Sequence, residues 1–528
     1  MVMPSLSLQE DYWETFELRE EDVEFLYNYL LESEMPMTPQ ELVEILVGER
    51  VQFEKQQIEQ QRTSGGALYM PKECYKVRQS LVFPALSWEK GEVVNVRPGR
   101  NPDIGEFEVI EVLFTNGNRR EYASSLADHV LNTPPSLQFQ DQNLDSEYIL
   151  AEYLEDLAEA LEKGLEANPD FVRIAGRWFP RALLVDINIG HLNLAEAVLD
   201  MAGGGPLPTS ELLEQIEFNA NVNPKLLEFS MDLALQEDPR FDEVGSAGKI
   251  LWFLQRLEPP EVLEPPLYLR YPGIEYDRSL LTEEMLALER ELDDELSPLE
   301  SRYQHLDEVD VKLIYPHWRA GTLPLSARLR HLFPTAYEAP RIRFTLVDID
   351  SGKKIPAWVV RSKRYVYGLR VWYTEHNLQP GSTIQVRRGA QPGEVIIKSN
   401  AHRPNREWIR TVLVGSDGGM VFAMLKQIVS ANFDDRMVIA IPDVEAIDQL
   451  WERTTKEHTP FERTVVNTVK ELAKLNPQGH VHASELYAAI NVVRRTPPGP
   501  LLAVLVSRPW FVHLGDLHYR FTETERIS

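Results

Sequence analysis

The sequence predicts an α+β multidomain chain with repeated winged helix-turn-helix units and two small β-barrel-like domains. The first observation is a phrase that occurs three times, as MTPQELVEIL from Met37, LPTSELLEQI from Leu207 and VHASELYAAI from Val481. The second is a tail of Pro-x-Phe-x-x-apolar-Gly followed by an aromatic-rich strand, which starts at Pro239 and again at Pro509. Repeats at irregular spacing indicate recurring small domains, whereas a solenoid repeats at a fixed period.

The composition limits the class of protein. A chain of 528 residues has room for about three to five domains, since one domain takes roughly 100–200 residues. No apolar run approaches the roughly 20 residues of a membrane span, and no basic region followed by an apolar stretch opens the sequence. The single cysteine, Cys74, excludes internal disulfides and a multi-cysteine zinc site. We therefore expect a cytoplasmic protein without membrane contact.

Acidic and basic residues are distributed unevenly along the chain. The net charge of −28 argues against a protein whose whole surface coats nucleic acid. Residues 341–410, however, hold fourteen Lys or Arg against five Asp or Glu, so this segment carries +9 and the remainder carries −37. A basic block within an acidic chain indicates a localised contact with an anionic partner.

The first domain, residues 15–75, is predicted to be a winged helix. Helical periodicity covers 21–31, and the repeated phrase supplies a second helix with Thr38 as its N-cap. A third helix is expected over 50–62, and residues 67–72 would form the wing.

Residues 76–131 are predicted to form a small SH3-like β-barrel. Short β-rich runs are separated by glycines, and Asn116-Gly117 is a strong signal for a two-residue hairpin. The sequence leaves open whether this barrel binds a ligand or acts only as a spacer.

A winged-helix region with one or two wings is expected over 148–257. It contains the phrase from Leu207 and the tail from Pro239. Residues 167–179 (ANPDFVRIAGRWF) add another copy of the tail, with no clear phrase directly before it.

Three further segments complete the chain. Residues 258–337 are predicted to be a proline-rich and acidic helical connector, whose helix over 282–300 is either solvated or a docking surface for a basic partner. Residues 338–445 are predicted to form a basic, β-rich, pseudobarrel-like domain. Residues 460–525 are predicted to form the last winged helix.

No catalytic motif is found in the sequence. It lacks a phosphate-binding loop, a dinucleotide fingerprint, an HExxH zinc motif and a GxSxG nucleophile elbow. Asp434 and Asp435 are the basis of one enzymatic alternative, a metal-dependent nuclease, although the acid-x-Lys pattern of such enzymes is missing. His480 and His482 have strand-like ligand spacing but no third ligand, so His482 is expected at a helix cap. We expect no enzymatic activity, no cofactor and no metal.

The basic segment is the best candidate for contact with DNA, double- or single-stranded. Cations alternate there with aromatic side chains, which suits neutralisation of the phosphate backbone and stacking on exposed bases. The candidate nucleic-acid-binding residues are Arg361, Lys363, Arg364, Tyr367, Arg370, Trp372, Arg387 and Arg388, together with Arg494 and Arg495 in the C-terminal unit. The alternative is that the arginines pair with the acidic helix around 283–295 of the same chain.

The predicted third helices carry few side chains suited to reading base edges. Residues 500–507 (PLLAVLVS) are apolar, and the helices over 224–236 and 50–62 offset their few cations with acidic residues. We therefore expect the helical units to dock proteins or support the fold more than they contact DNA.

The C-terminal unit resembles the HARE-type helix-turn-helix, on the pattern TVVNTVKELAKLNPQGHVHASELYAAI followed by WFVHLGDLHYRF. That family includes the N-terminal domain of the bacterial RNA polymerase delta subunit and modules fused to restriction and chromatin proteins. The resemblance covers residues 460–525 and implies a bacterial protein linked to DNA or RNA polymerase. Residues 341–400 are similar, in strand order and in the Leu-x-Pro-Gly at Leu378, to the pseudobarrel DNA-binding domains of plant transcription factors and restriction enzymes.

Three hypotheses about function follow. The leading one is a non-enzymatic, transcription-associated protein that contacts DNA through its basic β-rich domain and a partner such as RNA polymerase through its helical units. The second is an acidic interaction scaffold without a nucleic-acid role. The third is a nuclease centred on Asp434 and Asp435.

Overall fold

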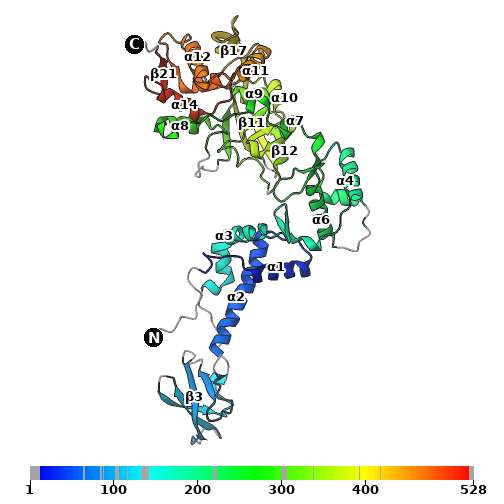
Figure 1. Cartoon of the computed structure of the whole chain (residues 1–528), viewed down its shortest axis with the longest axis vertical. Helices are drawn as coiled ribbons and strands as arrows, with labels where there is room; N and C mark the ends of the chain where they lie inside the picture. Colours follow the sequence, from blue (N-terminus) through cyan, green and yellow to red (C-terminus); the bar gives the residue numbers. More distant parts are fainter. Residues whose placement is uncertain are drawn as a thin grey trace. The chain divides into compact units, whose positions relative to one another are not determined.

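Figure 1 shows the computed structural model of the chain, which describes residues 12–63, 66–83, 86, 89–101, 106–115, 117–132, 142–216, 218, 223–298, 306–336, 338–389, 391, 393–416 and 418–522. Within these residues the protein has fourteen α-helices and six β-sheets, and it divides into two compact units, Met1–Leu184 and Val185–Ser528. The α+β multidomain class is therefore confirmed. None of the helices in the described ranges has both the length and the apolarity needed to cross a membrane.

The N-terminal unit is built on three helices and a short strand pair. These elements are α1 (Glu20–Ser33), α2 (Pro39–Thr63), α3 (Ser146–Glu166), β6 (Phe171–Ile174) and β7 (Arg177–Pro180). Thr38 starts α2 as expected, because its hydroxyl accepts a bond from the Glu41 N–H at 3.3 Å while its own N–H donates to the Glu41 carboxylate at 2.8 Å. Met37 exchanges two backbone hydrogen bonds with Trp178 of β7, with N···O distances of 3.2 and 2.7 Å.

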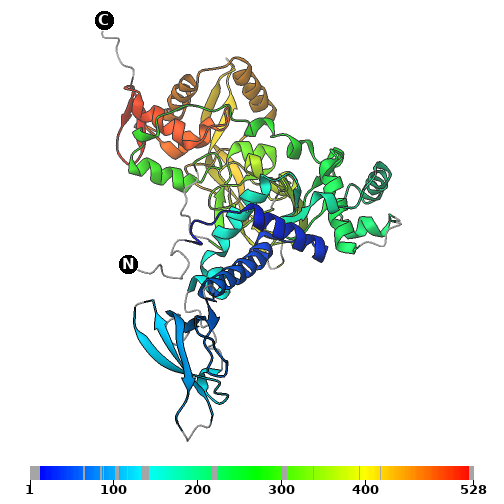
Figure 2. The same ribbon diagram turned by 60° about the horizontal axis from the view of Figure 1, so that its bottom comes forward.

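A five-stranded sheet is inserted between α2 and α3. Its strands, in spatial order, are β1 (Ala67–Leu68), β2 (Ser80–Phe83), β3 (Glu89–Pro98), β4 (Glu108–Phe114) and β5 (Arg119–Ser124). Alternate residues of β4, namely Ile110, Val112 and Phe114, are buried, as expected for a strand with one face on a core. Figures 1 and 2 show this sheet beyond the C-terminal end of α2.

The wing expected at 67–72 is wrong. Ala67 and Leu68 form β1, which pairs in parallel with β2. The next residue, Tyr69, stacks on Phe83 with ring centroids 4.7 Å apart. These residues therefore belong to the inserted sheet, because their backbone and aromatic groups are already paired within it.

The boundaries predicted for the first two domains change accordingly. The helical unit expected over 15–75 is interrupted by the inserted sheet, which covers 67–124 in place of the predicted 76–131. The tail at 167–179 is the continuation of the phrase at Met37, since β6 and β7 return to that residue.

The C-terminal unit opens with a second helical set. Its elements are α4 (Ile189–Met201), α5 (Thr209–Glu214), α6 (Pro224–Glu237), β8 (Phe241–Glu243) and β9 (Trp252–Leu254). Leu207 exchanges two backbone hydrogen bonds with Trp252, at 3.1 and 2.8 Å, as Met37 does with Trp178. The indole N–H of Trp252 donates to Asp232 of α6 at 2.9 Å. Burial raises the pKa of Asp232 to about 7, although this bond and one from Thr209 oppose the rise.

The seven-stranded sheet that follows is a curled, open half-barrel with the strand order β10-β15-β16-β12-β13-β14-β11. Its strands are β10 (Glu308–Lys312), β11 (Thr322–Pro324), β12 (Arg341–Asp348), β13 (Lys354–Val360), β14 (Tyr365–Tyr367), β15 (Thr383–Arg388) and β16 (Glu394–Lys398). Two connections carry the short helices α9 (Tyr315–Ala320) and α10 (Arg370–Glu375). Ile342, Phe344 and Leu346 alternate along β12 and are buried in the core.

The half-barrel begins earlier than the sequence analysis places it. The connector predicted over 258–337 contains α7 (Pro260–Leu263) and α8 (Glu283–Leu292), but β10, α9 and β11 belong to the sheet. The alternation in EVDVK at 308–312 is the strand signal that was missed, since Val309 and Val311 point into the core.

The connections of the half-barrel alternate between two rims. Rim A holds the described residues of the connections 325–340, 361–364 and 389–393, and rim B holds 313–321, 349–353 and 368–382. The strand β12 runs from Arg341 on rim A to Asp348 on rim B, a span of about 23 Å at roughly 3.3 Å per residue. Residues on the two rims therefore face different surroundings.

A long hairpin and a third helical set complete the chain. The hairpin pairs β17 (Ala401–Val414) with β18 (Met420–Ala431), and α11 (Val444–Lys456) follows it. The last elements are α12 (Phe461–Ala473), β19 (Val481–His482), α13 (Ala483–Ile490), α14 (Pro498–Ser507), β20 (Phe511–His513) and β21 (His518–Phe521). The strand before α13 again pairs with the last strand, in the sheet order β19-β21-β20.

Candidate nucleic-acid interface

Rim A gathers half of the predicted DNA-contacting residues. They come from two connections that are distant in sequence, the 3₁₀ turn Arg361–Lys363 after β13 and the end of β15. The residues are Arg361, Lys363, Arg364, Arg387 and Arg388. Strand topology places them on one rim because β13 and β15 both run towards it.

Backbone carbonyl oxygens, not carboxylates, accept the hydrogen bonds of three rim A arginines. Arg361 donates to the Ala339 carbonyl at 3.1 Å, and Arg364 donates to the Glu295 carbonyl at 3.0 Å. Arg388 donates to the His331 carbonyl at 2.5 Å. A carbonyl satisfies the donor but carries no opposite net charge, so these three hydrogen bonds are not ion pairs.

Two more rim A cations, Lys363 and Arg387, are exposed and have no ion-pair partner in the described part of the chain. Arg330, which the sequence analysis assigned to the connector, is likewise exposed and unpaired within that part, next to the His331 that Arg388 contacts. No local signal pointed to Arg330, because its place on rim A depends on β11 joining the sheet.

The charges near rim A are not all free. Arg341 at the start of β12 pairs with Asp242 and, at 3.1 Å, with Glu258. The carboxylate of Glu394 is held by Lys354 at 2.7 Å, and Glu308 accepts a bond from Gln385 at 2.8 Å. Glu394 and Glu308 are thus bound by other side chains, while Lys363, Arg387 and Arg388 stay open to solvent.

Three predicted site residues, Tyr367, Arg370 and Trp372, lie on rim B and not with the others. Trp372 is 1% exposed, so its ring belongs to the core and offers no surface for a base. Tyr367 is half-buried, and desolvation raises the pKa of its hydroxyl. Arg370 is the exposed member of the three.

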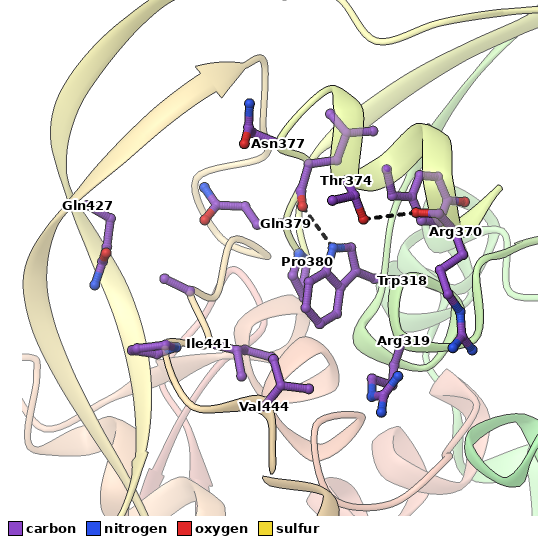
Figure 3. A pocket seen from close by; sticks show the side chains of 14 residues that line it. Trp318, Arg319, Arg370, Thr374, Asn377, Gln379, Pro380, Gln427, Ile441 and Val444 are labelled. Carbon is purple, nitrogen blue, oxygen red and sulfur yellow. Dashed lines mark hydrogen bonds between the residues drawn. The ribbon is translucent and has the colours of Figure 1, made fainter. Parts of the chain in front are cut away.

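Arg370 borders a cavity of about 490 Å³ on rim B, between the half-barrel and the hairpin (Figure 3). The Trp318 indole reaches into it and donates to the Leu378 carbonyl at 2.7 Å. Gln427 of β18 lines the side opposite Arg370. The neighbouring Arg319 is bound to Asp448 at 2.7 Å. Arg370 is therefore the cation that this cavity leaves free of a carboxylate among the described residues.

The expected phosphate contact by Arg495 is wrong. Its side chain is fully buried and pairs with Asp294 at 2.6 Å and with Glu295 at 2.7 Å. Arg494 is half-buried, donates to the Thr459 carbonyl at 2.8 Å and lies 5.5 Å from the Phe461 ring centroid. The donors of these two arginines point into the protein, so the side chains stabilise the contacts of the C-terminal helices.

The acidic helix α8 forms no described ion pair with Lys363, Arg387 or Arg388 of rim A. Three of its four carboxylates and the one that follows it are paired with other residues: Glu283 with Arg290, Glu289 with Arg278, Glu291 with Lys312 and Asp293 with Arg328. Among the described residues, Arg364 reaches this region only through the Glu295 carbonyl. The internal pairing considered from the sequence is therefore formed in part, since Arg328 of rim A pairs with Asp293, whereas Lys363, Arg387 and Arg388 have no ion-pair partner among the described residues.

The acidic groups proposed for a nuclease have other partners. Asp434 pairs with Lys312 at 2.9 Å and accepts the N–H groups of Arg436 and Met437. Asp435 belongs to neither of the two His/Asp clusters with metal-ligand geometry in the described ranges, which are His482–Asp516–His518 and Asp348–Asp350–His376.

The role expected of His482 at a helix cap is confirmed. Its Nδ1 accepts the Ser484 N–H at 3.1 Å at the start of α13. A guanidinium nitrogen of Arg436 lies 3.0 Å from the His482 Nε2. Burial lowers the pKa of His482 to about 4, and the Arg436 charge adds to the shift, so the ring is neutral near pH 7.

Comparisons of the chain with protein-family models, curated proteins and solved structures gave no match. The resemblances of residues 460–525 and 341–400 to known DNA-associated families therefore stay predictions. The function has to be argued from the charges and contacts of the rims.

Proposed function

We propose that this protein binds DNA through rim A of its half-barrel, with the phosphate backbone as the main contact. The observation that carries the proposal is the gathering of Lys363, Arg387, Arg388 and Arg330 on one rim without a described carboxylate partner. Solvated cations that face outward are available to phosphates, and each contact releases a counterion from the DNA. The strand order and the two short helices also support the pseudobarrel interpretation of this domain.

The mode of binding follows from the side chains present. Lys363 and the arginines can neutralise phosphates, which fix register and orientation but carry little sequence information. The whole chain has a net charge of −28, and the part outside residues 341–410 carries −37. This charge repels DNA from other faces and favours an approach by rim A.

We propose that the three helical sets are winged helices that serve protein contacts. Their support is the repeated pairing of the residue before the middle helix with the strand pair, at Met37, Leu207 and Val481. In the C-terminal set the third helix, α14, has its residues Pro498 to Ala503 buried and cannot enter a DNA groove. A transcription partner such as RNA polymerase is the expectation for these surfaces, in a DNA-associated role.

The test is charge reversal on rim A with a matched control. The triple variant Lys363→Glu, Arg387→Glu, Arg388→Glu should weaken binding to a mixed-sequence duplex by about tenfold or more at moderate salt, measured by fluorescence anisotropy. The control reverses Lys353, Lys456 and Lys474, which are already paired with Glu375, Glu452 and Glu471. It has the same net charge as the first variant.

The duplex affinity of the control variant should fall by about threefold at most, because charges far from the contact act on DNA only through a field that salt screens. Equal losses in the two triple variants would show that overall charge, and not rim A, controls binding. Wild-type affinity in the rim A variant would refute the proposal.

A further inference from the structure

The hairpin β17–β18 exposes a face that combines apolar and cationic side chains. Its members alternate along the two strands, and they are Arg406, Trp408, Met424, Lys426 and Ile428, called here the hairpin face. Trp408 is 63% exposed, Ile428 is 66% exposed and Met424 is 42% exposed. Large apolar side chains that are this exposed and lie together on one surface indicate a binding site.

The register of the hairpin fixes how these side chains lie together. Trp408 is directly opposite Lys426, and Arg406 is directly opposite Ile428. The Lys426 ammonium lies 5.4 Å from the centroid of the Trp408 ring. Directly opposed residues of antiparallel strands project to the same side, so the ring and both cations share one surface.

The hairpin is held in place from the other side and from its tip. Ile409 and Val429 are buried against Val438 and Ala440. Towards the tip, Val412 and Phe422 enter the core that α11, α12 and α13 share. The hairpin face is therefore a fixed platform, because the packing that orders the strands does not involve Trp408.

The five members of the hairpin face include two cations and no acid, and the next residue on that side of β17, Arg410, pairs with Glu485 at 2.9 Å. Arg406 and Lys426 are exposed and have no ion-pair partner in the ranges that the structure describes. Glu407 projects from the opposite side of β17 and accepts a bond from Asn405 at 3.2 Å. The surface is thus complementary to a partner that offers negative charge next to flat apolar groups.

We infer that the hairpin face binds single-stranded nucleic acid, with an unpaired base stacked on Trp408 and the adjoining phosphates beside Arg406 and Lys426. Bases carry flat apolar faces and phosphates carry the charge, and both lie within reach of such a surface. In a duplex the base faces are covered by their neighbours, so the duplex offers Trp408 nothing to stack on. The inference goes beyond rim A, since the hairpin follows β16 and leaves the half-barrel on the rim B side.

The experiment compares two labelled probes, a dT oligonucleotide of about 16 nucleotides and a mixed-sequence duplex of the same length. Trp408→Ala should weaken dT binding by about tenfold and leave duplex binding within about twofold of wild type. Trp408→Phe, which keeps a stacking ring, should retain most of the dT affinity. Phe53→Ala removes another exposed aromatic ring, in the N-terminal unit, and should change neither affinity.

Each outcome decides between the two sites. The inference is overturned if the Trp408→Ala variant binds dT with wild-type affinity. It is also overturned if the variant loses affinity for dT and for the duplex by the same factor. A wild-type protein that binds the duplex but not dT also overturns it and leaves the rim A proposal standing. Binding of dT that depends on Trp408, without any duplex binding, supports the hairpin face and refutes rim A.

Discussion

Rim A and the site around Arg495 both contain arginine side chains, which are exposed on rim A and buried at the second site. On rim A, Arg387 and Arg388 face solvent, and the acceptor that Arg388 has is a carbonyl. Arg495 is 1% exposed and is held by the carboxylates of Asp294 and Glu295. The sequence presents all three as equivalent members of Arg-Arg pairs, at 387–388 and at 494–495.

The difference shows that the partner of an arginine, and not the number of charges near it in the sequence, decides whether its charge is neutralised inside the protein. The Arg495 site, defined by Arg495, Asp294, Glu295, His317 and Tyr487, joins α9 to the helices α13 and α14. Its charges cancel inside the protein. On rim A, Lys363, Arg387 and Arg388 face solvent instead.

The largest effect is expected at the Arg495 site. Arg495→Met leaves two buried carboxylates without their cation and should lower the free energy of unfolding by about 3–5 kcal/mol. The rim A triple variant should change it by less than about 1 kcal/mol, because exposed cations contribute little to stability. Urea denaturation followed by circular dichroism measures both, and an Arg495→Met protein that unfolds at the wild-type urea concentration would contradict the structural role.

A smaller effect on the free energy of unfolding is expected when the pH is lowered. Burial by itself would raise the pKa of Glu295, but the charges of Arg495 and His317 outweigh it, so the net shift is downward. The stabilisation by this carboxylate is therefore complete above its ordinary pKa of about 4 to 5 and is lost as the pH falls towards the folded value. The stability gap between wild type and Arg495→Met should narrow between pH 6 and pH 3, and a constant gap over that range would show that Glu295 is not part of the effect.

The sequence predicted that the helical sets exist better than it predicted where each set begins and ends. The phrase from Leu207 and the tail from Pro239 lie in one set, as expected, and Leu207 pairs with Trp252. The first set could not be assembled in the same way, because the inserted sheet separates Met37 from Trp178 along the chain. Only a comparison of all three phrases with all three tails could have suggested that 167–179 belongs to Met37.

The candidate site was predicted in composition but not in arrangement. The excess of Lys and Arg over 341–410 identified the right domain for an exposed cationic rim. The separation of Arg370 from Arg387 follows from strand direction, which a count of charges cannot give. Trp372 and Arg495 are buried, so neither can contact DNA. Their burial could not be predicted, because the elements that surround them, α9 and the end of α8, are far away in sequence.

The measurement that tests the central claim most directly is the salt dependence of duplex binding. For the wild type, the logarithm of the association constant should fall linearly with the logarithm of salt concentration. In Lys363→Glu, Arg387→Glu, Arg388→Glu the slope should be shallower by about 2–3, since each phosphate contact contributes roughly 0.9. A slope identical to that of the wild type would mean that these three side chains do not contact the DNA backbone.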